Sequence, residues 1–401
     1  MDARPMPVNA GGASSVALLL MPVMAAVLVV FVITGAALPA LPLHIHDDLG
    51  FGAFVVGLVA GAQFAAALVS RLWAGSYADR RGAKHAVIAG LVMSVLAGLL
   101  YLVSLGATAE PVLSVAILLA GRALLGGAES FIITGAQSWG LALAGPGNSG
   151  KAIAWIGTAM YIALAGGAPI GSMLYGAFGF SAIGLTTMGV PLLALLLVLQ
   201  LKSVAPFPHA QANYRRVARA VLLPGIGMAF ASLGYGAMIA FAVLHFTERG
   251  WQPAWLSFTL FALALIIARL CLGGLPDRMG GARSAMIFVT VQSAGLALVC
   301  LAPSALFGFA GAALTGFGYS FVYPGLGIEA VQRAPVESRG MAMGIYTAFL
   351  DVALGVLSPL LGLLAGVAGL SSVFGLSAFL ALCTVPLAAR MVVKPHQRRL
   401  F

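Results

Sequence analysis

The sequence predicts an all-α membrane protein with twelve transmembrane helices in two six-helix, pseudo-symmetric halves. Composition, the spacing of apolar runs and an internal repeat predict this fold. Of the 401 residues, 61% are hydrophobic and only 8% are charged, whereas roughly 25% are charged in an ordinary soluble domain. So few charges cannot cover a water-exposed surface, and the hydrophobicity is too high for intrinsic disorder. A soluble globular protein and a disordered chain are therefore excluded.

Apolar segments separated by short polar, Gly- or Pro-bearing stretches define the helices, and a bilayer crossing needs roughly 20 apolar residues. The predicted spans are 16–41, 53–73, 85–106, 112–139, 152–177, 181–200, 220–246, 254–272, 284–303, 306–330, 341–368 and 371–391. The first run is too long for a secretory signal, so we expect an uncleaved span. The longest polar interruption divides the chain into an N-terminal half (1–201), a cytoplasmic linker (202–219) and a C-terminal half (220–401).

The basic residues predict the orientation of these helices. With the N-terminus in the cytoplasm, 17 of the 21 Lys and Arg residues fall in cytoplasmic segments and only Arg249 falls on the opposite face. Because positive charge is retained in the cytoplasm during insertion, both termini are predicted to be cytoplasmic. The net charge of +10 therefore follows from topology, and we expect contact with the lipid bilayer rather than with nucleic acid.

The two halves repeat one another in sequence. The first set of matches has an offset of 198 and pairs Arg71, Asp79, Arg80 and Gly82 with Arg269, Asp277, Arg278 and Gly280. A second set has an offset of 190 and pairs Gly126, Ser130, Gly135 and Pro169 with Gly316, Ser320, Gly325 and Pro359. Two parallel halves related by an axis along the membrane normal are a transporter architecture.

These motifs resemble those of the major facilitator superfamily. The stretch 75–84, GSYADRRGAK, resembles the family's loop between its second and third helices, except that Ala83 stands where the family has a basic residue. Residues 273–283 form a second copy between helices eight and nine, and 121–127 resemble the fourth-helix pattern of proton-coupled members. Residues 166–171 partly resemble the fifth-helix antiporter motif. Overall the chain is similar to a bacterial group labelled arabinose-efflux-permease-like.

The repeated loops are the strongest family signal. The resemblance implies that they latch the cytoplasmic side and guide the rocking of the halves. The predicted latch residues are Gly75, Asp79, Arg80, Gly82 and Lys84 in the first copy and Gly273, Asp277, Arg278, Gly280 and Arg283 in the second. The alternative is ordinary charged loops that fix topology; two copies at the correct places favour the latch.

Three ionisable residues fall well inside predicted spans, where a charge costs about 2.5–3.5 kcal/mol on insertion scales. Arg122 and Glu129 lie on helix four, seven residues and so roughly 10 Å apart along the axis. Asp351 lies on helix eleven, and the repeat places Tyr161 at the equivalent position in the first half. Proton coupling at Glu129 or Asp351, with Arg122 tuning the acid or holding an anion, is one interpretation. Buried structural pairing is the other.

Further candidates are mechanical, aromatic or metal-binding. The matched prolines Pro169 and Pro359 are predicted helix pivots, because Pro removes a backbone donor and kinks a helix. Tyr235 and Tyr319, on helices seven and ten, are the first choices for substrate contact, although packing with a satisfied hydroxyl is the simpler interpretation. The group formed by His44, His46, Asp47 and Asp48 is predicted to be a solvated loop rather than a metal site. We expect no cofactor.

The sequence therefore predicts a monomeric secondary active transporter in the bacterial inner membrane. Proton-coupled efflux of a small organic compound by alternating access, as an antiporter, is the preferred interpretation. Proton-coupled uptake and sugar export are alternatives, and a non-transporting sensor or a membrane-embedded enzyme is less favoured. No nucleotide-binding loop, H-E-x-x-H or G-x-S-x-G motif is present in the sequence, so an enzyme is not expected.

Overall fold

The computed structural model describes residues 13–144, 149–201, 214–272, 275–334 and 339–392. All regular elements within these residues are helical. The first half contains α1 (Ala13–Leu43), the π-helix η1 (His44–Asp48), α2 (Ala53–Arg81), α3 (Ala83–Leu105), α4 (Pro111–Ala144), α5 (Ser149–Phe178) and α6 (Phe180–Leu199). The second contains α7 (Tyr214–Glu248), α8 (Leu256–Leu272), α9 (Leu275–Met279), α10 (Gly281–Leu301), α11 (Ala305–Arg333), α12 (Arg339–Ala368), α13 (Leu370–Leu382) and α14 (Thr384–Ala389).

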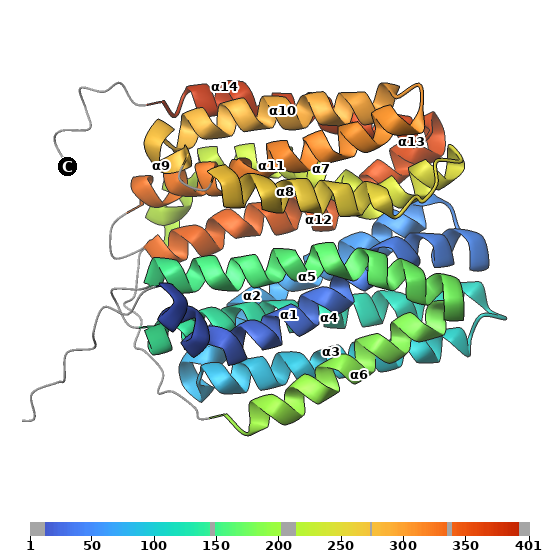
Figure 1. Ribbon diagram of the computed structural model, residues 1–401, viewed down its shortest axis with the longest axis horizontal. Helices are drawn as coiled ribbons and strands as arrows, with labels where there is room; N and C mark the ends of the chain where they lie inside the picture. The colour runs from blue at the N-terminus through green and yellow to red at the C-terminus, as the bar shows by residue number, and fades with distance from the viewer. Residues whose placement is uncertain (1–12, 145–148, 202–213, 273–274, 335–338, 393–401) are drawn as a thin grey trace, which may run out of the picture.

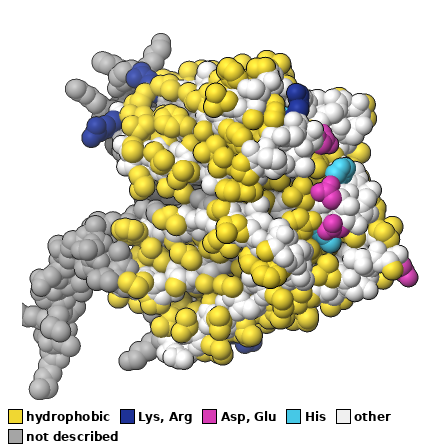
Figure 2. Space-filling model, turned by 45° about the vertical axis from the view of Figure 1, so that its right-hand side comes forward, with side chains coloured by type: hydrophobic (Ala, Val, Ile, Leu, Met, Phe, Trp, Pro, Cys, Tyr) yellow, Lys and Arg dark blue, Asp and Glu magenta, His cyan; other side chains and the backbone are white. Residues whose placement is uncertain are grey.

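The predicted all-helical membrane fold is confirmed. Among the described residues, eleven helical segments are long and apolar enough to span a bilayer, with α13 and α14 forming one of them. The one remaining predicted span, 254–272, corresponds to α8, an apolar helix that is shorter than these eleven. Figure 1 shows the long helices side by side, with α1–α6 in the lower part of the view and α7–α14 in the upper part. Figure 2 shows hydrophobic side chains over the body, with Asp, Glu and His side chains gathered at one end.

The predicted linker is shorter than residues 202–219. Helix α7 begins at Tyr214, so Arg215, Arg216 and Arg219 lie on its first turns rather than in a loop. Arg has a long apolar stem, so its charged head can reach water while its backbone is helical. The helix therefore extends through these arginines, beyond the apolar run that predicted the span. Residues 202–213 of the predicted linker lie outside the described residues.

The sequence repeat is matched by a repeat in backbone geometry. Gly82 begins α3 at φ 93° and ψ 153°, and Gly280 begins α10 at φ 89° and ψ 148°. These positive φ values suit glycine, which lacks the Cβ that disfavours them. Helix packing repeats as well: Gly126 of α4 lies against the backbone of Gln63 in α2, and Gly316 of α11 lies against that of Phe261 in α8. The halves therefore share one packing plan.

A seam of small residues joins the halves where α2 packs on α12. A Cβ built on Gly57 would lie 2.5 Å from the Ser358 carbonyl oxygen, and one on Gly61 would lie 2.8 Å from that of Gly355. A Cβ built on Gly362 would lie 2.5 Å from the Ala53 carbonyl oxygen. Small residues allow helix backbones to approach this closely in a membrane. We call these four glycines of α2 and α12 the glycine seam; it lies in the part of α2 nearest η1, away from the basic α2–α3 turn.

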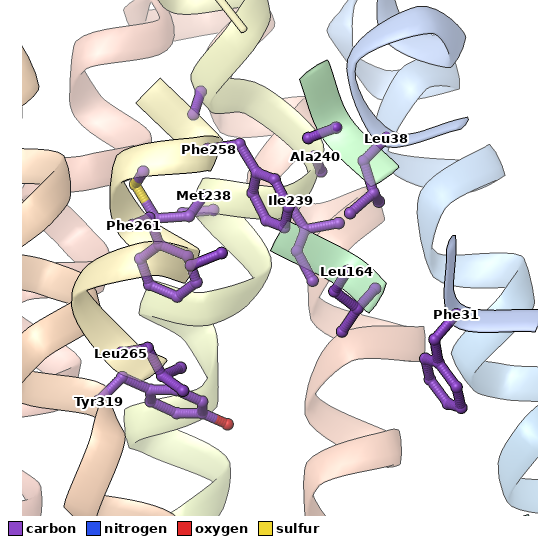
Figure 3. Close-up of a cluster of buried hydrophobic side chains, with 14 of the residues drawn as sticks. Phe31, Leu38, Leu164, Met238, Ile239, Ala240, Phe258, Phe261, Leu265 and Tyr319 are labelled. Carbon is purple, nitrogen blue, oxygen red and sulfur yellow. The ribbon is translucent and has the colours of Figure 1, made fainter. Parts of the chain in front are cut away.

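Other contacts between the halves involve α1 with α7 and α5 with α8. Figure 3 shows how their side chains meet: Leu164 of α5 lies between Phe31 of α1 and Ile239 of α7. Leu38 of α1 lies close by. Leu38, Leu164 and Ile239 are buried members of one hydrophobic core that includes residues of both halves. This apolar contact forms the wall of the candidate site.

Candidate functional site

Two small adjoining cavities lie between the halves. The larger, which we call the central cavity, has a volume of about 40 Å³. It is lined by Phe31, Thr34, Leu38, Gln63, Phe64, Arg122, Glu129, Leu164, Tyr235 and Ile239. The smaller, which we call the apolar cavity, has a volume of about 10 Å³. Its lining is Leu38, Leu41, Pro42, Ile45, Val56, Val59, Ala60, Arg122, Ile239 and Ala240.

The dimensions of these cavities limit what they can hold. A water molecule needs at least about 10–15 Å³ of cavity measured in this way. The central cavity therefore has room for a few waters and none for an organic molecule. Binding of an organic substrate here would require these cavities to widen, which a movement of the halves would provide.

Arg122 of α4 lies where the two cavities meet. The residue is 1% exposed, and its Nε and Nη1 atoms are buried without a hydrogen-bond partner. The Tyr101 hydroxyl of α3 lies beside the guanidinium but makes no hydrogen bond of ordinary geometry. Arg122 lines both cavities and is the one basic residue in either lining. A buried guanidinium with free donors thus faces the space between the halves.

Glu129 lies in the same central cavity and is held by the first half. The Thr34 hydroxyl donates to Glu129 Oε1 at 2.7 Å, and Gln63 Nε2 donates to the same oxygen at 2.6 Å. Among the described residues, the ion pairs within 4 Å do not include one between Glu129 and Arg122. The sequence predicted that these two residues are too far apart for a close pair, and the geometry agrees. Thr34 was not predicted from the sequence.

Asp351 has a partner in the opposite half. Arg71 Nη2 of α2 donates to Asp351 Oδ2 of α12 at 2.6 Å. The Asp351 side chain is 3% exposed and that of Arg71 is 27% exposed. Their charges meet just beyond the glycine seam, on the side toward the basic α2–α3 turn. This ion pair directly connects the two halves, and Arg71 had not been predicted as a site residue.

The predicted aromatic candidates form a pair within the second half. Tyr235 of α7 stacks on Tyr319 of α11, with ring centroids 4.9 Å apart and planes at 8°. Tyr235 lines the central cavity. Tyr319 is 2% exposed and lies behind that lining, and Figure 3 shows it beside Leu265 and Phe261. The pair therefore offers an aromatic wall through Tyr235, which Tyr319 supports from behind.

The predicted latch loops are mostly helical, which corrects the sequence interpretation. Gly75, Asp79 and Arg80 lie within α2, and Asp277 and Arg278 lie within α9. Among the described residues of these loops, single glycines at positive φ, Gly82 and Gly280, separate α2 from α3 and α9 from α10, because one such residue is enough to turn the chain. The side chains of Asp79 and Asp277, and the residue Gly273, lie outside the described parts of the chain. Arg80, Arg278 and Arg283 are exposed.

Two charged residues near these turns secure helix ends. Lys84 Nζ donates to the carbonyl oxygens of Leu199, at 2.9 Å, and of Leu201, and so caps the end of α6. Glu329 Oε1 of α11 accepts from the Ala282 backbone N–H of α10 at 3.0 Å. Glu329 Oε2 also lies 3.6 Å from Nη2 of Arg333, one turn further along α11. Lys84 and Glu329 therefore stabilise helix ends beside the two turns.

The predicted solvated loop after helix one is wrong for His44. Residues His44–Asp48 continue α1 as a π-helix, and His44 is buried. His44 Nδ1 lies 2.6 Å from Asp48 Oδ2, and its ring stacks on Phe180 at 4.1 Å. Tertiary packing on α6 outweighs local polarity here. Among the described residues, no group of three or more His, Cys, Asp or Glu side chains is placed to hold a metal.

Comparison with known sequences establishes the family to which this chain belongs. The Major Facilitator Superfamily profile matches residues 23–308 and 225–400. The chain belongs to the Major Facilitator Superfamily. An uncharacterised MFS-type transporter of Salmonella typhimurium is 39% identical, with 92% of this chain and 95% of that protein covered. The uncharacterised MFS-type transporter YhhS of Escherichia coli is 38% identical over 90% of both chains.

Solved structures of the superfamily share this fold at low sequence identity. A D-xylose–proton symporter matches with a TM-score of 0.76 at 13% identity, with 93% of this chain and 97% of that one covered. The nucleoside transporter NupG matches with a TM-score of 0.74 at 14% identity, with coverages of 94% and 100%. These relatives and neighbours are transporters rather than enzymes. Family membership makes this chain a multi-pass membrane transporter of the secondary class.

Proposed function

We propose that this protein couples proton movement to the export of a small organic compound by alternating access. The observation that carries the proposal is the ion pair between Arg71 and Asp351, because it joins the two halves. A proton on Asp351 removes the negative charge that attracts Arg71. The attraction between the halves then weakens, and the halves can separate. Asp351 is the proton carrier in this proposal, since its protonation state bears directly on the movement.

The orientation of the molecule completes this mechanism. We place the basic turns and both termini in the cytoplasm of a bacterial inner-membrane protein, following the distribution of Lys and Arg. The glycine seam then closes the outer side, so opening toward the cytoplasm gives a compound access to the central cavity. The latch role of the α2–α3 and α9–α10 turns and the pivot role of Pro169 and Pro359 belong to the same proposal. A monomer is sufficient for it.

Export is supported by the fifth helix. The stretch that resembles the antiporter motif lies where α5 packs on α1. Gly167 and Gly171 there lie against the backbones of Val32 and Ala36. Ala168 between them does not interrupt this close approach, because the two glycines make the contacts. Helix α5 can thus slide or tilt against α1 without repacking large side chains.

Uptake by proton symport is the second candidate, and the central cavity supplies the observation in its favour. Arg122 and Glu129 both line that cavity. An anion at Arg122 and a proton on Glu129 together leave the net charge of the cavity unchanged. Binding of the two would therefore be mutually favourable, which is the thermodynamic basis of symport.

Transport in vesicles of opposite orientation distinguishes these candidates. We expect a pH gradient to drive accumulation in everted vesicles if the protein exports, and in right-side-out vesicles if it imports. Collapse of the gradient with a protonophore should remove accumulation in either case. Accumulation that persists after collapse would contradict proton coupling. A sodium-dependent or passive mechanism would then replace it.

Cysteine labelling tests the proposed orientation. In a background with Cys271, Cys300 and Cys383 replaced by Ser, an impermeant thiol reagent should label single cysteines at Asp48, Ala109 and Gln252 from outside. Cysteines at Ser149, Gln211 and His396 should be labelled only after permeabilisation. Outside labelling at Gln211 would contradict a cytoplasmic connection between the halves.

A further inference from the structure

The buried guanidinium of Arg122 has hydrogen-bond donors that the described protein atoms do not satisfy. Two of its nitrogens have no hydrogen-bond partner, although the residue is 1% exposed. A buried charge without a partner costs several kcal/mol. A membrane protein retains such a group where a ligand or a relay completes it.

The two buried acids of the candidate site, Glu129 and Asp351, already have other partners. Glu129 Oε1 accepts from both Thr34 and Gln63, and Glu129 forms no ion pair with Arg122. Asp351 is paired with Arg71. Neither acid satisfies the free Nε and Nη1 atoms of Arg122, which leaves a place for an anion supplied from outside.

We propose that the transported compound is an organic anion whose carboxylate binds Arg122. Nε and Nη1 carry N–H donors at different edges of one planar guanidinium, so a carboxylate can accept from one of them while its charge offsets that of Arg122. The proposal names the cargo of the transport function proposed above. It holds for export and for uptake, because both use the same central cavity.

The rest of the lining defines the body of this anion. The apolar cavity on one side of Arg122 is walled by aliphatic side chains, including Leu38, Val59 and Ile239. The central cavity adds the rings of Phe31 and Phe64. Such walls bind an aliphatic or aromatic group through burial of apolar surface. The cargo class is therefore a monocarboxylate with an apolar body rather than a polyanion or a neutral sugar.

Gln63 adds one polar feature to this class. Its Nε2 donates to Glu129, whereas its Oε1 is buried without a partner. Gln63 lines the central cavity together with Arg122. A hydroxyl or N–H on the cargo would satisfy this acceptor, because unpaired buried oxygens are costly. Hydroxy- or amino-substituted monocarboxylates should therefore bind more tightly than their unsubstituted parents.

Matched acids and amides test the proposal on the purified full-length protein. The probes are benzoate and mandelate with their amides, and hexanoate with hexanamide, each measured by thermal stabilisation and isothermal titration in detergent micelles. We expect the acids to bind and the amides, which have the same shape without the charge, to bind about ten- to a hundredfold more weakly. Mandelate should bind more tightly than benzoate.

Variants connect this effect to Arg122. Arg122→Gln should abolish the preference for acid over amide, and Arg122→Lys should keep a reduced preference, since it keeps the charge without the planar guanidinium. Arg390→Gln, at an exposed residue far along the chain, removes the same charge and should bind like the parent. The Lys variant keeps the test valid if the Gln variant fails to fold.

Several results would overturn the anionic cargo. Equal binding of acids and amides, no binding of any acid, stabilisation by chloride or sulfate alone, or an unchanged preference in Arg122→Gln would each do so. None of these measurements involves transport. Proton-driven transport in vesicles could thus survive the loss of this inference, and acid binding could survive the loss of proton coupling.

Discussion

Two arginines at repeat-related positions differ in the partners that they bind. Helices α2 and α8 are equivalent in the two halves, and each carries an Arg, Arg71 and Arg269. Arg71 reaches across to Asp351 of α12, in the other half. Arg269 Nε donates to the Ser320 carbonyl oxygen of α11, at 3.1 Å and within its own half. The residue that corresponds to Asp351 by the repeat is Tyr161 of α5.

This difference separates what the scaffold needs from what the function uses. Both halves build the same helix packing and the same positive-φ turns, so the repeated Arg position is part of the common plan. The acid is present in one half only. Packing of the bundle therefore does not require a carboxylate at this position, which favours a functional role for Asp351.

The largest expected effect comes from removing the acid. Asp351→Asn keeps the shape of the side chain and removes the charge that binds Arg71. Loss of a partner from a buried pair costs up to about 3–5 kcal/mol, and less where one partner is partly exposed as Arg71 is. We expect gradient-driven accumulation in proteoliposomes to fall at least about tenfold, while exchange of substrate without a gradient continues. Accumulation like that of the parent would remove Asp351 from the proton path.

The two arginines give a matched pair of variants. Arg71→Gln should lower the transport rate about tenfold, because it breaks the contact between the halves. Arg269→Gln should lower it by no more than about threefold, because the position that corresponds to Asp351 is Tyr161, so no repeat-related acid is left without its partner. Initial rates in the same vesicles measure both. Equal losses would show that the two contacts are equivalent and would break the comparison.

Glu129 offers a test of the second acid. Glu129→Gln retains a side-chain oxygen that can accept from Thr34 and Gln63, so we expect a smaller loss of rate, about threefold. Its response to the pH gradient should stay like that of the parent, since its hydrogen bonds remain within the first half. A loss of gradient response in Glu129→Gln alone would transfer the carrier role to Glu129. Normal responses in both neutral variants would exclude both acids.

The smallest expected contrast lies in the repeated turns. Asp79→Ala should impair transport without preventing membrane insertion, and Asp277→Ala should do less, because the first copy keeps more of the family pattern. Membrane content on immunoblots gives the control for insertion, and substrate flux gives the effect. Parent-like flux in Asp79→Ala would exclude the latch role at that residue.

The sequence was sufficient to predict the helices but not the side-chain contacts between them. Apolar length and basic loops locate the helices to within a few residues in most cases, because the bilayer imposes both signals. The offset of seven residues on one helix was enough to predict that Arg122 and Glu129 are not paired. The contact of Arg71 with Asp351 joins residues 280 positions apart. Only the packing of α2 on α12 creates it, and no local pattern encodes that packing.

The residues that bind Glu129 were missed for a related reason. Thr34 and Gln63 come from α1 and α2, and their side chains meet the acid because three helices converge there. A Thr within an apolar run gives no distinctive signal, since its hydroxyl can bond to its own helix. The π-helix at His44 was similarly hidden, because polar residues after a span usually indicate a loop.

The glycine seam also determines how the protein responds to a larger side chain at the contact between α2 and α12. The backbones of α2 and α12 touch at Gly57, Gly61, Gly355 and Gly362, so a methyl group at any of these positions acts as a wedge between the halves. A wedge of this kind leaves the interior of each half unchanged and raises the free energy of one conformation only. It therefore shifts the population toward the opposite conformation. If the halves rock as proposed, the spacing of the α2 and α12 backbones at these glycines sets the relative free energies of the two conformations.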